Sequence, residues 1–129
     1  MANLRVDKIT STETFETTGS VQFDGVNDGL TVTDVAAFDL GTGDFTIEGW
    51  YYLVNAGAYL SLFDFRGSGG DGVYPSLFRN NTGNYIYYYV DSAQRISNVS
   101  INYNTWFHVA VCRSSGITRL FLNGKEKGS

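Results

Sequence analysis

The sequence lacks the residues on which several protein classes depend. Among its 129 residues it has one cysteine, one proline, one methionine and one histidine. Cys112 has no partner for an internal disulfide, and it lies in an apolar run where a thiol behaves as a small buried hydrophobe. One histidine without a nucleophile-elbow motif excludes a Ser-His-Asp triad. No stretch approaches the roughly eighteen uninterrupted apolar residues of a membrane span.

Positive charge is also sparse. Nine Lys and Arg residues stand against thirteen Asp and Glu residues, and the formal net charge is −4. Because the basic residues are scattered, no patch neutralises phosphates, and no nucleic-acid partner is expected. The first eight residues interleave charges with single apolar residues, unlike the apolar core of a signal peptide. We expect a soluble protein made without classical export.

Aromatic residues and glycines are abundant instead. Aromatic residues make up 16% of the chain, which also has fifteen glycines. Aromatic side chains fit pleated surfaces, and glycines permit the positive-φ turns between strands. A chain of this length holds one core. The composition therefore predicts a single β domain.

Alternating segments separated by turns cover most of the chain. Residues 1–19 are polar and rich in Thr and Ser, and we interpret them as an N-terminal arm or attachment segment before a domain spanning 20–129. The apolar run 106–113 predicts a strand covered on both faces, and Asn123-Gly124 predicts a type I′ hairpin. Regular strand spacing without a helical period predicts a sandwich or barrel. The predicted strands are 20–24, 30–33, 44–54, 59–65, 73–78, 85–90, a segment around Val99 and Ile101, 106–113, 117–122 and a return strand from 125.

Four motifs in register resemble the laminin G-like family of the concanavalin A-like jelly rolls. The resemblance implies an all-β, antiparallel jelly-roll β-sandwich. Such a fold continues for several strands beyond Asn123-Gly124, so this sequence is either a fragment or a C-terminally short version. If it is complete, an open sheet edge invites a homo-oligomer or another partner strand. The motifs are Val21-Gln22-Phe23-Asp24-Gly25 with Asn27-Asp28, Gly41 to Trp50, Trp106-Phe107-His108-Val109-Ala110, and Leu120-Phe121-Leu122-Asn123-Gly124.

The N-terminal lead is similar to that of structural proteins of marine bacteriophages, including those of cyanobacteria. The residues concerned are Val6 to Glu13 and the continuation Thr17 to Gly25. This resemblance implies a virion component, located on a capsid or tail surface, with other virion proteins as partners.

An enzymatic hypothesis comes from the retaining glucanases of this architecture, which need two carboxylates about 5 Å apart on one face. Those enzymes place acidic residues at alternate positions of one strand. Here Asp44 and Glu48 have Thr46 between them, so the pattern is missing and we expect no enzyme. Glu48 and His108 can meet across a sheet, where they are expected to satisfy each other as partly buried polar groups.

Calcium is a candidate cofactor, because laminin G-like and related lectin domains often bind it. Hard cations take six to eight oxygen ligands from several loops. Asp24, Asp28, Asp64 and Asp71 lie in or beside predicted loops, but they lack a loop-motif spacing. The alternative is that these aspartates cap turns.

Carbohydrate binding is the main functional hypothesis. Flat rings with a polar group suit sugars, since the ring stacks and the hydroxyl forms hydrogen bonds. Trp50 and Tyr52 share the predicted non-core face of one strand, and Tyr85, Tyr87 and Tyr89 share a face of another. Rows of aromatic side chains are also ordinary sheet packing. Two functions therefore remain open: a lectin-like module on a virion surface, and a purely structural assembly protein.

Overall fold

The computed structural model describes residues 19–24, 28–33, 38, 40–54, 57, 59–66 and 74–129. It divides the chain into two compact units, Met1–Thr33 and Asp34–Ser129. The predicted boundary between an arm at 1–19 and a domain at 20–129 stays a prediction. Within the described ranges, no helix is long and apolar enough to cross a membrane.

The described part of the first unit is not the hairpin that the sequence predicts. Residues 20–24 and 30–33 have no strand assignment, so that prediction is wrong. Their apolar side chains are exposed, among them Phe23 and Val32. Alternation leads to a strand when a sheet covers one face, and here these side chains are left in solvent. The backbone N–H of Asp24 donates to Asp28 Oδ2 at 2.9 Å.

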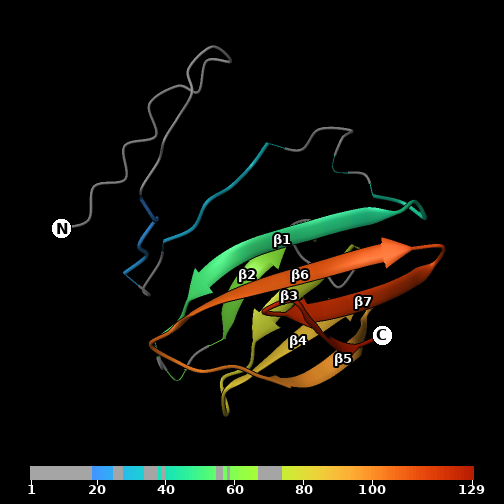
Figure 1. Cartoon of the computed structure of the whole chain (residues 1–129). Coiled ribbons are helices and arrows are strands. Elements are labelled where there is room, and N and C mark those ends of the chain that lie inside the picture. Colours follow the sequence, from blue (N-terminus) through green and yellow to red (C-terminus); the bar gives the residue numbers. More distant parts are fainter. Residues whose placement is uncertain are drawn as a thin grey trace. The chain divides into compact units, whose positions relative to one another are not determined.

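The second unit is an all-β sandwich of two antiparallel four-stranded sheets (Figure 1). It confirms the predicted fold class. The first sheet has the order β1-β6-β7-β8, with β1 at Phe45–Tyr52, β6 at Trp106–Ser114, β7 at Ile117–Leu122 and β8 at Lys125–Gly128. The second has the order β2-β3-β4-β5, with β2 at Leu60–Asp64, β3 at Ser76–Arg79, β4 at Tyr85–Val90 and β5 at Ala93–Ser100.

The core lies between the inner faces of the two sheets. Alternate residues of β6 enter it, and β7 adds Leu120 and Leu122. The second sheet contributes the opposing layer from β3, β4 and β5. Period-two alternation thus sets which side chains are buried. The buried cluster is Leu77, Ile86, Tyr88, Ile96, Val99, Ile101, Phe107, Val109, Val111, Leu120 and Leu122.

The prediction that the β6 strand is covered on both faces is wrong. Its burial alternates, with Phe107, Val109 and Val111 buried and Trp106 exposed. Two sheets in a sandwich leave each strand one outer face. The outward-facing residues of β6 from Trp106 to Cys112 are therefore apolar or aromatic without being buried in a second core.

Two-residue turns connect the last three strands, and the one at Asn123-Gly124 lies where the sequence predicts it. Asn123 and Gly124 have φ of 49° and 74°, and Ser115 and Gly116 have φ of 51° and 80°. A type I′ turn needs positive φ at both central residues. Asn123 Oδ1 also accepts the backbone N–H of His108 at 2.8 Å, which joins this turn to β6.

Candidate functional site

The outer face of β1 carries two large exposed aromatic side chains. Burial alternates along the strand, as the sequence predicts, so Glu48, Trp50 and Tyr52 point away from the core. Trp50 is 66% exposed and Tyr52 is 46% exposed. Exposed rings of this size on adjacent outward positions can serve as an interaction surface.

The neighbouring strand β6 completes this surface. Antiparallel pairing sets Trp50 opposite His108 and Tyr52 opposite Trp106. The ring centroids of the first pair are 5.2 Å apart and those of the second are 5.7 Å apart. Trp106 is itself 49% exposed. We call Trp50, Tyr52, Trp106 and His108 the aromatic platform.

A polar pair borders the platform. His108 Nε2 lies 3.4 Å from Glu48 Oε2, on the same outer face. The expectation that these two residues meet across the sheet is confirmed. The Glu48 carboxylate is more exposed than the imidazole, so it remains accessible to a ligand lying on the rings. An acceptor beside stacked rings is the combination by which proteins hold sugar hydroxyls.

The three tyrosines of β4 lie on the other sheet. Their neighbours Ile86 and Tyr88 are in the core, so Tyr85, Tyr87 and Tyr89 alternate outward on the second sheet. The structure therefore does not bring the five predicted ligand-binding residues together, because Trp50 and Tyr52 are on the outer face of the first sheet.

Tyr87 has mainly a packing role. It is 8% exposed, its ring stacks on Phe78 with centroids 5.9 Å apart, and its hydroxyl donates to Asn98 Oδ1 at 3.3 Å. The Tyr89 ring also packs against the Phe78 ring, with centroids 6.1 Å apart. Cross-strand aromatic pairs of this kind stabilise a sheet by themselves.

The calcium candidates lie in different parts of the chain. Asp64 pairs with Arg66, whose Nη2 and Nε lie 2.6 Å and 2.8 Å from its carboxylate oxygens. Hydrogen bonding from Arg66 lowers the pKa of Asp64 below its ordinary value. Asp24 and Asp28 belong to the first unit, and Asp71 lies outside the described residues. No group of three potential metal ligands occurs in the described ranges.

The carboxylates considered for glycoside hydrolysis have separate partners. Asp44 Oδ1 accepts the backbone N–H of Ser115 at 2.9 Å and so braces the β6–β7 turn. Glu48 faces His108. The geometry gives each of these acids a local role of its own.

Comparison with known proteins now identifies the family. The family model described as the concanavalin A-like lectin/glucanases superfamily matches residues 24–129. The chain belongs to this superfamily. Comparison with curated proteins and with solved structures gave no significant match. The superfamily includes both lectins and glucanases, and a carbohydrate-binding module fits it.

Sequence reasoning did not name Trp106 or His108 as ligand-binding residues, although it placed His108 near Glu48. Trp106 and His108 sit in the apolar run 106–113, which looked like a doubly covered strand. The signal that could have found them is the period-two offset from Phe107, which sends residues 106 and 108 to the face opposite the core. In this member of the superfamily that face carries both tryptophans of the chain.

Proposed function

We propose that this protein is a non-enzymatic, lectin-like module that binds carbohydrate on its aromatic platform. The observation that carries the proposal is the exposure of three large rings, Trp50, Tyr52 and Trp106, on paired positions of adjacent strands. Membership of a superfamily that contains lectins supports the same ligand class.

The chemistry of the platform suits a pyranose ring. The C–H faces of a sugar are apolar and stack on indole and phenol rings, while its rim of hydroxyls needs donors and acceptors. Glu48 supplies an acceptor beside Trp50, and the indole N–H groups and the Tyr52 hydroxyl supply donors. A carboxylate at this position repels anionic sugars. We therefore expect neutral glycans.

A glycan array tests the proposal. Trp50→Ala and Trp106→Ala each remove an exposed ring, so each should weaken binding of a neutral glycan at least about tenfold with little change in folding stability. Tyr59→Ala is the matched control, because Tyr59 is an exposed aromatic residue next to β2 of the other sheet. Binding that survives both tryptophan substitutions, or that Tyr59→Ala abolishes equally, would place the ligand elsewhere.

The biological setting we propose is a virion surface, as a fibre or head decoration. Its support is the resemblance of the N-terminal lead alone. Immunogold labelling of purified phage particles tests it: labelled particles are expected, and a protein found only in unassembled fractions would contradict it.

A structural assembly role is the second candidate, and the strand order favours it. Among the described strands, β1 ends the first sheet and β2 ends the second, so each has one side without a described partner strand. Unpaired edges invite a strand from another chain. Light scattering decides: a closed oligomer without glycan binding supports assembly, and a stable monomer contradicts it.

A further inference from the structure

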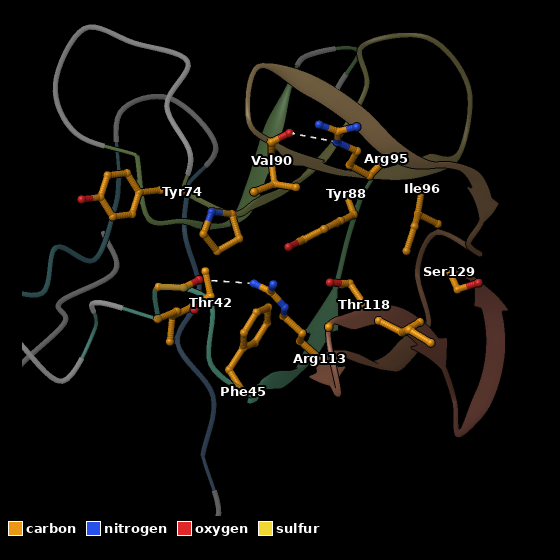
Figure 2. A pocket seen from close by; sticks show the side chains of 15 residues that line it. Thr42, Phe45, Tyr74, Tyr88, Val90, Arg95, Ile96, Arg113, Thr118 and Ser129 are labelled. Atoms are coloured by element: carbon orange, nitrogen blue, oxygen red, sulfur yellow. Dashed lines mark hydrogen bonds between the residues drawn. The ribbon is translucent and has the colours of Figure 1, made fainter.

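A cavity opens between the two sheets where β1 begins and β6 ends (Figure 2). Its volume is about 960 Å³, close to the upper end of the range for small-molecule sites. Apolar side chains from both sheets and from the segments before β1 and β3 form much of the wall: Leu40, Phe45, Pro75, Val90, Ile96 and Ile117. The aromatic platform is on the opposite, outer face of the first sheet, so this is a separate site.

The cavity holds an arginine that faces inward. Phe107, Val109 and Val111 of β6 are core residues, and the same alternation turns Arg113 to the inner face. Its Nη1 donates to the carbonyl oxygen of Gly41 at 3.3 Å. Its Nε is buried and has no hydrogen-bond partner in the described part of the chain. A buried guanidinium N–H without a partner is rare in folded proteins, so the described protein groups satisfy this guanidinium only in part.

Tyr88 faces Arg113 from the other sheet. It is 2% exposed, and its hydroxyl end is directed into the cavity in Figure 2. Burial raises the pKa of Tyr88, and the positive charge of Arg113 acts in the opposite direction. The phenol is therefore a neutral hydrogen-bond donor at physiological pH, close to the guanidinium.

Both charged side chains that line the cavity are arginines. Arg95 also lines it, although its Nη2 is paired with Asp91 at 3.2 Å and its Nε donates to the Val90 carbonyl oxygen at 3.4 Å. None of the lining residues that the structure describes is an aspartate or a glutamate. A cationic group in a largely apolar cavity without lining carboxylate side chains favours an anion.

We propose that this cavity binds a small organic carboxylate, whose charged group contacts Arg113 and Tyr88 and whose apolar body lies against Phe45, Val90 and Ile96. A guanidinium is a preferred partner of a carboxylate, because it places a positive charge and N–H donors together. The phenol donates a further hydrogen bond to the same group. Thr42 and Thr118 also line the cavity and supply hydroxyls for a polar substituent.

Isothermal titration of the full chain with benzoate and with its neutral counterpart benzamide tests the charge requirement. Benzoate is expected to bind at least about tenfold more tightly than benzamide. Hexanoate should bind as benzoate does, because the apolar walls have no strict shape requirement for a ring. Equal binding of benzoate and benzamide, or no binding of either carboxylate, would overturn the proposal.

Substitutions locate the site. Arg113→Met keeps the length of the side chain and should abolish benzoate binding, and Tyr88→Phe should weaken it several-fold. Arg119→Met is the control, because Arg119 points to the outer face of β7, where it lies near Glu126. If Arg113→Met does not fold, Tyr88→Phe still decides the result. Unchanged benzoate affinity in Tyr88→Phe would contradict the assignment, and so would a loss of affinity in Arg119→Met.

Discussion

Trp50 and His108 occupy directly paired positions on β1 and β6, with ring centroids 5.2 Å apart and an interplanar angle of 55°. The same imidazole approaches Glu48 at 3.4 Å. One residue thus supports an exposed indole on one side and contacts a carboxylate on the other. His108 therefore connects the exposed rings of the platform with the carboxylate beside them.

Removing His108 should weaken glycan binding while leaving the fold intact. An aromatic contact contributes about 0.5–1.5 kcal/mol beyond area burial, so His108→Ala is expected to reduce affinity roughly two- to tenfold by titration calorimetry. His108→Phe keeps a ring beside Trp50 and should retain most of the affinity. If the Ala and Phe variants lose affinity equally, the ring contact is not what positions Trp50.

Leu120 tests the core. It is fully buried on β7 between the sheets, so Leu120→Ala should lower the free energy of unfolding by about 2–5 kcal/mol in urea denaturation. Val54→Ala, at an exposed position after β1, should change it by less than about 0.5 kcal/mol. A similar effect of both substitutions would mean that the core is not where the structure places it.

Much of this architecture could be predicted from the sequence, and the failures share a cause. Each strand from β1 to β8 overlaps a predicted one, although β5 was predicted only around Val99 and Ile101. The strand at 106–113 was predicted from an apolar run and not from alternation. The hairpin predicted at 20–33 failed, because alternation alone does not say whether a sheet covers one face. Trp106 was missed for the same reason. Local sequence also does not say which strands share a sheet or how the two sheets face each other. That arrangement brings Arg113 of β6 toward Tyr88 of β4.

The β7–β8 turn should depend on the glycine at its second position. Gly124 has φ of 74°, where a side chain is strained, and a Cβ there would meet no neighbouring atom. Gly124→Ala should therefore cost about 1 kcal/mol of stability through backbone strain alone. Gly43→Ala is the control, since a Cβ at Gly43 comes no nearer than 3.5 Å to its neighbours and its φ is not positive. Thermal unfolding that ranks the two variants in the reverse order would contradict this explanation.

The Asp64–Arg66 pair predicts a pH-dependent contribution to stability. Hydrogen bonding from Arg66 lowers the pKa of Asp64 below 3.8 in the folded state. The pair therefore contributes its full share to the stability of the fold above pH 3.8. That share is lost as the pH falls through the lower pKa of Asp64 in the folded state. Because the pair is partly exposed, Asp64→Asn should cost only about 0.2–1 kcal/mol at pH 7. In urea denaturation, the difference in stability between the two proteins should shrink as the pH falls below 3.8. A difference that grows on acidification would contradict this linkage.

The central claim is that the aromatic platform is the glycan-binding surface, and intrinsic tryptophan fluorescence tests it most directly. The chain has two tryptophans, Trp50 and Trp106, and both belong to the platform. Titration with a neutral oligosaccharide identified on the array should shift their emission to the blue and protect both from acrylamide quenching. Saturable binding that leaves the emission and the quenching unchanged would contradict the claim.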